Sequence, residues 1–102
     1  MTRLLVLYKT PADTAAFDTY YFHTHVPLAK TIPGLRAYTV NDGSLNLVAG
    51  NEAPYLIAQL DFDTPADLQL ALASPEGMAA AADLVNFGQA GVTILTFETR
   101  TL

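Results

Sequence analysis

The sequence has no cysteine, no tryptophan and few charged residues. Without cysteine the chain has no disulfide, no thiolate metal site and no cysteine nucleophile. Only 15% of the residues are charged, with 10 acids and 5 bases, and the bases are scattered along the chain. Nucleic acids and anionic membrane surfaces are bound by clustered lysine and arginine, so we expect neither partner.

The sequence also has no long apolar run. Near its start, Leu4–Tyr8 is far shorter than a membrane-spanning helix or the apolar part of a secretory signal. We therefore expect a cytoplasmic protein without a membrane segment. The 102 residues fit a single domain, residues 1–102.

Hydrophobic residues, by contrast, make up 51% of the chain. This content excludes a disordered chain. It also exceeds what one small core comfortably buries. Either the surface is unusually apolar or a partner covers part of it.

Apolar patterning and turn residues predict four strands, at residues 3–9, 35–40, 55–62 and 91–97. Glycine, asparagine and proline place a long turn or extended arm at residues 41–54. Three helices are predicted at residues 13–30, 64–73 and 74–87. The first has a kink or break near Pro27, which lacks a backbone N–H. The other two each begin with a capping hydroxyl followed by proline, at Thr64 and Ser74.

The element order β, α, β, β, α, β is typical of a ferredoxin-like α+β fold. It gives a four-stranded antiparallel sheet with the helices on one face. Apolar side chains alternate onto both faces of the strands, so both faces should be buried. The simplest cover for the face without helices is a second copy of the same sheet, which predicts a homodimer.

His23 and His25 are the only histidines. Their spacing directs them to opposite sides of a helix, so they cannot share a metal ion, and we expect no metal site. His25 is four residues beyond Tyr21 and eight beyond Phe17, which places it on the buried face. There it is either a tuned acid or base or a core histidine bonded to a carbonyl.

Other polar side chains are candidates for a ligand cleft. They are the hydroxyls of Tyr8, Tyr21, Tyr38 and Tyr55, and the side chains of Gln59 and Asp61. Tyrosines of this kind are more often residues at the edge of a core. Gln59 and Asp61 share one face of their strand, and a cleft, a ligand or His25 would satisfy them there. Asp61 at the strand end in water is the simpler alternative.

Several segments together resemble the EthD-like proteins of the dimeric α+β barrel superfamily. They are Leu5-Val-Leu-Tyr8 followed by Pro11, Phe17-Asp18-x-x-Tyr21, Thr24-His25-x-Pro27-Leu28-Ala29, Pro33-Gly34-Leu35-x-x-Tyr38, Ser74-Pro75-Glu76-Gly77, Ala81-Ala82-Asp83-Leu84 and Gly91-Val92-Thr93. The resemblance covers nearly the whole chain. It implies a ferredoxin-like monomer that dimerises sheet against sheet, with clefts between each sheet and its helices.

The family is named for a protein associated with fuel-ether degradation alongside a cytochrome P450 system. Its superfamily includes lactone isomerases, cofactor-free monooxygenases, polyketide cyclases and haem-handling proteins. In a related lactone-rearranging enzyme, a histidine at the position matching His25 acts in catalysis. Members often have an acid at the position of Gln59 and an aromatic at that of Asp61, which weakens a pairing of His25 with a strand carboxylate. The lack of tryptophan counts against a haem oxygenase.

Three hypotheses remain at this point. The first is a cofactor-independent enzyme that transforms a small apolar lactone, polyketide or aromatic or ether catabolite, with His25 as acid or base. The second is a non-catalytic carrier or accessory protein of an oxidoreductase system. The third is a mainly structural dimer whose cleft is filled by its own side chains.

Overall fold

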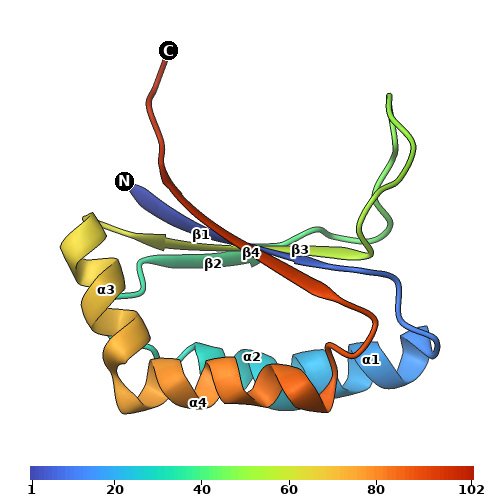
Figure 1. Cartoon of the computed structure of the whole chain (residues 1–102), viewed down its shortest axis with the longest axis horizontal. Helices are drawn as coiled ribbons and strands as arrows, with labels where there is room; N and C mark the ends of the chain where they lie inside the picture. The colour runs from blue at the N-terminus through green and yellow to red at the C-terminus, as the bar shows by residue number, and fades with distance from the viewer.

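A four-stranded antiparallel sheet carries all the helices on one face (Figure 1). In this computed structural model, which describes residues 1–102, the strands follow the order β2-β3-β1-β4. They are β1 (Thr2–Tyr8), β2 (Ala37–Val40), β3 (Leu56–Phe62) and β4 (Val92–Glu98). The predicted ferredoxin-like α+β fold is confirmed. β2 and β3 each begin slightly later than the second and third strands predicted from the sequence.

Two helical units cover the sheet. The first contains α1 (Thr14–Tyr20), a π-helical turn η1 (Tyr21–His25) and α2 (Val26–Ala29). The second contains α3 (Pro65–Ala73), α4 (Pro75–Asp83) and a short 3₁₀ turn η2 (Leu84–Asn86). The capping signals are confirmed, since the side chains of Asp13, Thr64 and Ser74 each accept a backbone N–H from the first helical turn. The last α-helix ends earlier than predicted, at Asp83.

Pro27 changes the first helical unit in an unexpected way. Its ring would clash with the carbonyl four residues earlier, and it has no N–H for the helical ladder. The chain does not break there. Instead, the turn before it widens, and the N–H of Val26 reaches back to the carbonyl of Tyr21. Such π-helical turns are frequent at functional sites, and this one carries His25.

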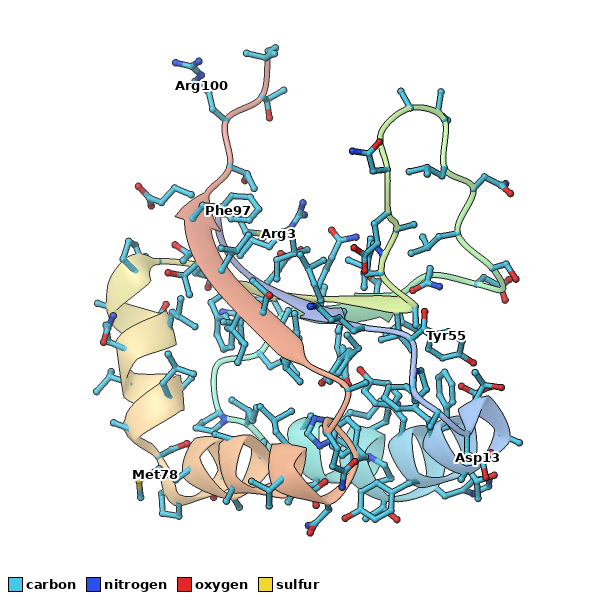
Figure 2. All side chains as sticks on the ribbon, turned by 45° about the vertical axis from the view of Figure 1, so that its right-hand side comes forward. Arg3, Asp13, Tyr55, Met78, Phe97 and Arg100 are labelled. Carbon is cyan, nitrogen blue, oxygen red and sulfur yellow. The ribbon has the colours of Figure 1, made fainter.

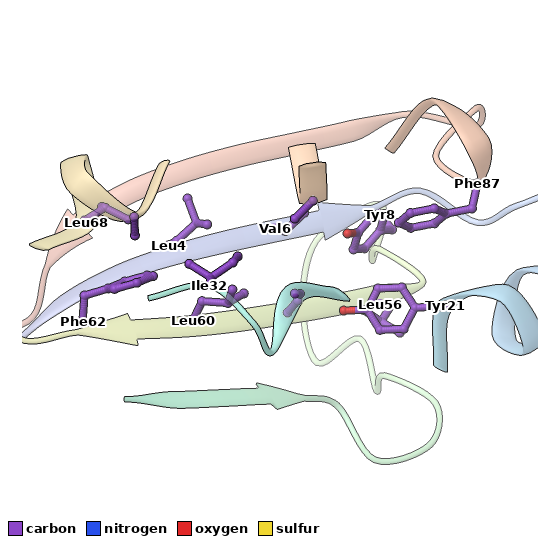
Figure 3. Packing of buried hydrophobic residues seen from close by; sticks show 14 of the residues in the cluster. Leu4, Val6, Tyr8, Tyr21, Ile32, Leu56, Leu60, Phe62, Leu68 and Phe87 are labelled. Atoms are coloured by element: carbon purple, nitrogen blue, oxygen red, sulfur yellow. The ribbon is translucent and has the colours of Figure 1, made fainter. Parts of the chain in front are cut away.

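The main core lies between the sheet and the helices (Figure 3). Leu4, Val6 and Tyr8 alternate onto this side of β1, opposite Leu60, Ala58 and Leu56 of β3. All six are buried, as the alternation predicts. Tyr21 and Phe87 close one end of this core.

The other face of the sheet has no helix over it. There Leu5, Leu7 and Ile57 are half-buried, whereas Leu95 and Phe97 of β4 are 47% and 42% exposed. Figure 2 shows Phe97 and Arg3 on this side of the sheet, away from the helices. Residues 41–54 form an arm without helix or strand that rises on this side of the sheet (Figure 1). The predicted arm is confirmed, and so is an apolar sheet face without helical cover.

One expectation for β4 is wrong. Ile94 points to the helical side but is 48% exposed. β4 is an edge strand, and the helices cover mainly β1 and β3. In a single chain β4 is therefore covered fully on neither face.

The corner between α3 and α4 depends on Gly77, and its replacement by alanine should destabilise the fold. A Cβ at residue 77 would lie 2.0 Å from the carbonyl oxygen of Ala71, a backbone atom with little freedom to move. We expect a net loss of about 1–3 kcal/mol, because the clash outweighs alanine's advantage of about 1 kcal/mol in a helix. Urea denaturation measures the loss. Glu76→Ala, at an exposed neighbouring position, is the control, and equal stability of the two variants would contradict the prediction.

Candidate functional site

A mostly apolar cavity of about 240 Å³ lies between the sheet and the helices. Of its 17 lining residues, 14 are hydrophobic. The lining comes from both layers and includes Leu4, Val6, Ala58, Leu60, Ile32, Ala80, Leu84 and Ile94. No lysine, arginine, aspartate or glutamate reaches it. The cavity therefore suits an uncharged molecule and offers it few polar groups.

His25 is one of these polar groups, and the π-helical turn places it there. The residue is buried, as its position on the face shared with Phe17 and Tyr21 predicts. Its ring packs on Phe87 and Tyr21, with centroid distances of 4.6 Å and 5.4 Å. His23 is exposed on the other side of the helix, so the two histidines do not meet.

The imidazole is held by a carboxylate from the second helical unit. Nδ1 of His25 lies 2.9 Å from Oδ2 of Asp83, and both side chains are more than 90% buried. Asp83 also accepts hydrogen bonds from the hydroxyl of Tyr20 at 2.5 Å and the amide of Asn86 at 2.9 Å. The carboxylate thus has three donors and is held at the last residue of α4.

These contacts set the charge of Asp83. Burial acts to raise its pKa, but the hydrogen bonds from Tyr20, Asn86 and His25 outweigh burial and hold the pKa below the usual 3.8. Asp83 is therefore ionised at neutral pH and only accepts hydrogen bonds. The proton in the contact with His25 must lie on Nδ1. Nε2 of a neutral imidazole then carries the lone pair.

Three tyrosines add hydroxyl groups to the cavity lining: Tyr8, Tyr21 and Tyr38. The hydroxyls of Tyr21 and Tyr38 bond to each other at 2.6 Å. Burial raises the pKa of all three tyrosines above the ordinary range. They are therefore protonated at neutral pH and can donate hydrogen bonds.

Two side chains that line this cavity each have a polar atom without a partner in the protein. The two atoms are Nε2 of His25 and the hydroxyl oxygen of Tyr8. Of the buried side-chain polar atoms, only Oγ1 of Thr2 is both sealed from solvent and unpartnered. The His25 and Tyr8 atoms are therefore not sealed from solvent, and a ligand or water in the cavity that both residues line can satisfy them.

Three of the predicted site residues lie elsewhere. Tyr55 precedes β3, and its hydroxyl donates to Asp18 of α1 at 2.8 Å. Gln59 and Asp61 point to the sheet face away from the helices, and Asp61 bonds to Arg3 there at 2.8 Å. Their alternation in β3 is opposite to that of the buried Leu60, so they cannot join His25 in the cavity.

Sequence reasoning missed the carboxylate that does reach His25. Asp83 lies in the Ala81-Ala82-Asp83-Leu84 segment, and no local pattern pairs it with a histidine 58 positions away. A signal was present: Asp83 follows Ala80 by three positions and Gly77 by six, on the buried face of an alanine-rich helix. An acid on such a face needs a partner.

The structure shows no cluster of three or more His, Cys, Asp or Glu side chains arranged to hold a metal ion. It also has no helix of the length and apolarity needed to span a membrane.

A family model and a solved structure that resemble this chain both point to the same family. A family model described as the EthD domain matches residues 9–90. The chain is 42% identical over 103 residues to the "Uncharacterized 11.0 kDa protein in thcB-thcC intergenic region" of Rhodococcus erythropolis, covering 100% of this chain and 98% of that one. The crystal structure of an ethyl tert-butyl ether d (ethd) family protein from Bacillus halodurans c-125 has a TM-score of 0.89 and 35% identity, covering 98% of this chain and 99% of that one.

Two more distant structures share the fold. One is a dimeric ferredoxin-like protein of unknown function from Thermobifida fusca, with a TM-score of 0.69 and 18% identity, covering 96% of this chain and 90% of that one. The other is SnoaB, a cofactor-independent oxygenase from Streptomyces nogalater, with a TM-score of 0.66 and 16% identity, covering 99% of this chain and 94% of that one.

The low pKa of Asp83 predicts how stability depends on pH. The ionised carboxylate stabilises the fold fully above the unfolded pKa, near 3.8, and this contribution disappears as the pH falls through the lower folded pKa. At neutral pH, Asp83→Asn should cost about 1.5–3 kcal/mol, the usual range for hydrogen bonds to a charged group.

Urea denaturation from pH about 7 to about 2 tests this prediction, since the difference between wild type and Asp83→Asn should shrink below about pH 4. Asp42→Asn removes a carboxylate from an exposed position in the arm and is the matched control. A stability difference for Asp83→Asn that stays constant down to the lowest pH would contradict the prediction.

Proposed function

The chain belongs to the EthD domain family, and on this premise we propose that it binds a small apolar molecule in the cavity and moves a proton on it with His25. The ligand is a lactone, a polyketide or an aromatic or ether catabolite. The reaction proceeds without a cofactor.

The observation that carries this proposal is the buried His25–Asp83 pair, whose His25 lines an apolar cavity and keeps Nε2 free of any protein partner. Asp83 accepts the Nδ1–H, which fixes the tautomer and orients the ring. The negative charge of Asp83 also stabilises the imidazolium that forms when Nε2 accepts a proton. Nε2 is therefore arranged as a general base that can return the same proton as a general acid.

The cavity limits the substrate. Its volume of about 240 Å³ is smaller than the usual range of about 300–1,000 Å³ for drug-sized ligands. A compound of one or two rings fits this space better than a long chain. Exchange of a proton between His25 and such a ring transfers no electrons, so an isomerisation or cyclisation on this site requires no redox partner.

The same apolar lining supports a second function, holding the ligand without changing it. In that case the protein is a carrier or an accessory to an oxidoreductase system. The two functions differ in what His25 contributes, because the 14 hydrophobic lining residues would still retain the ligand after its replacement.

We also propose that two copies of the chain pair through the sheet faces that lack helices. Leu5, Leu7, Ile57, Leu95 and Phe97 line this face and give it a continuous apolar centre. The Arg3–Asp61 ion pair lies at its edge. Contiguous apolar faces of this kind are rare on monomers. In a dimer with two-fold symmetry, the same face of the second copy packs against this face.

Replacement of His25 by asparagine should remove proton transfer and leave ligand binding intact. Asparagine can still donate to Asp83 but has no basic nitrogen. The assay follows exchange of acidic C–H protons for deuterium in 2-tetralone and in small unsaturated lactones by NMR. We expect wild-type protein to accelerate the exchange and His25→Asn to lose about 10²–10⁴-fold of that acceleration.

His23→Asn, on the exposed side of the same helix, is the control for this assay and should keep the wild-type rate. Full exchange activity in His25→Asn would disprove the acid–base role. Tight binding by wild-type protein with no exchange on any compound would instead favour the carrier function.

The pairing of the sheets predicts the mass in solution. Light scattering should give twice the chain mass of 10.9 kDa, and Phe97→Glu should shift the protein toward 10.9 kDa by placing a charge on the apolar face. Leu70→Glu, on an exposed position of α3 away from that face, should leave the mass unchanged. A wild-type mass of 10.9 kDa at micromolar concentration would refute the dimer.

A further inference from the structure

Tyr8 is a buried tyrosine with a free hydroxyl. It is the last residue of β1 and is only 2% exposed. Its hydroxyl makes no hydrogen bond in the protein, although Tyr20, Tyr21, Tyr38 and Tyr55 each make one. Figure 3 shows Tyr8 and Tyr21 with their hydroxyl oxygens turned toward the middle of the sheet. A buried hydroxyl is normally satisfied, so this exception calls for a ligand or ordered water.

The ring that carries this hydroxyl cannot easily turn away. It packs against Phe17 at 5.6 Å, Tyr21 at 5.5 Å and Phe87 at 5.5 Å between ring centroids. Contacts on several sides fix the ring, and the hydroxyl is thereby held at one place on the cavity wall. Burial raises the pKa of Tyr8, with Tyr38 and Asp83 nearby adding to the effect. The hydroxyl therefore stays protonated and acts as a donor.

His25 and Tyr8 open on the same cavity and share two neighbours. Both rings pack on Tyr21 and on Phe87. A ring-shaped molecule in the cavity can therefore face Nε2 of His25 at one atom and the Tyr8 hydroxyl at another. This is the arrangement that acid–base chemistry next to a carbonyl needs, with a base at the proton and a donor at the oxygen.

We propose that Tyr8 donates a hydrogen bond to the oxygen that becomes negative when His25 removes a proton. This inference rests on the proposed function and names its substrate class: small, neutral, cyclic ketones or lactones with an acidic C–H proton one conjugated step from an oxygen, and phenols, whose acidic proton is on the oxygen itself. In a ketone or lactone the C–H bond breaks, the proton bonds to Nε2, and the electron pair moves onto the oxygen as an enolate. In a phenol the O–H bond breaks, the proton bonds to Nε2, and the electron pair stays on the oxygen as a phenolate. Return of the proton to the same or another atom completes an exchange or an isomerisation.

The Tyr21–Tyr38 pair offers a second donor. In a pair of hydroxyls at 2.6 Å, one proton joins the two oxygens and the other remains free. The cavity has no cationic side chain apart from His25 once it is protonated. A substrate that is already an anion has no fixed counter-charge there, so the site selects molecules that are neutral on entry and become anionic only after His25 has accepted their proton.

The probe for this inference is 4-nitrophenol, which is neutral when protonated and changes its visible absorption on ionisation. Wild-type protein should bind it and lower its apparent pKa, because the imidazolium of His25 and the hydroxyl of Tyr8 stabilise the phenolate. Tyr8→Phe keeps the ring and its packing but removes the donor. We expect it to weaken phenolate binding by about 10- to 100-fold, the value of a hydrogen bond to a charged group.

Two controls accompany this titration. Tyr55→Phe removes a tyrosine hydroxyl that lies outside the cavity and should behave as wild type. Binding of 4-nitroanisole, which has no ionisable proton, should be nearly the same in wild type and Tyr8→Phe. A crystal of the complex should place the phenolate oxygen about 2.5–3.0 Å from the Tyr8 oxygen.

The outcomes separate this inference from the role of His25. Loss of phenolate affinity in Tyr8→Phe together with loss of ionisation in His25→Asn supports both. Loss in Tyr8→Phe alone supports the donor and disproves the acid–base role of His25. Loss in His25→Asn alone overturns the donor role of Tyr8. Failure of wild-type protein to bind 4-nitrophenol, or equal affinity of wild type and Tyr8→Phe for the phenolate, also overturns the inference.

Discussion

The hydrogen bond between His25 and Asp83 is the contact on which the arrangement of the site depends. It joins residues 58 positions apart and connects the π-helical turn to the end of α4. Without it, the Asp83 carboxylate would lose one of its three donors, and the buried imidazole would lose the acceptor that orients it, which is unfavourable. With it, the two helical units are held at a fixed separation above the sheet. Because the contact holds Nδ1, it also fixes the direction of Nε2 on the opposite side of the ring.

Local sequence explains how the histidine comes to this place. Pro27 cannot continue a regular helical ladder, and the chain responds with a wider turn directly before it. The wider turn keeps Tyr21 and His25 on the buried side, while Ala29 continues the buried face beyond the proline.

Much of this fold follows from the alternation of apolar residues in the strands and from the capping residues of the helices. Alternation in β1 and β3, and the hydroxyl–proline starts of α3 and α4, depend on neighbouring residues and are visible in the sequence. The helical spacing that links His25 to Tyr21 is equally local. Contacts between distant segments are not visible in this way, which is why Asp83 was not identified as the partner of His25. Side chains alternate between the two faces of a strand, which places Gln59 and Asp61 on the same face. Packing decides which face the helices cover, and the strand pattern alone does not show this.

The apolar surplus of the sequence is divided between two places, and β4 belongs to both. Ile94 and Thr96 form part of the cavity wall, whereas Leu95 and Phe97 belong to the face without helices. Alone, β4 pairs with only one neighbour and is largely exposed. A second sheet packed on Leu95 and Phe97 would restrain the strand whose other side bounds the ligand. In the proposed dimer, pairing of the sheets and the shape of the site would be coupled through this one strand, so substitutions on the outer face of β4 would act on the cavity without touching it.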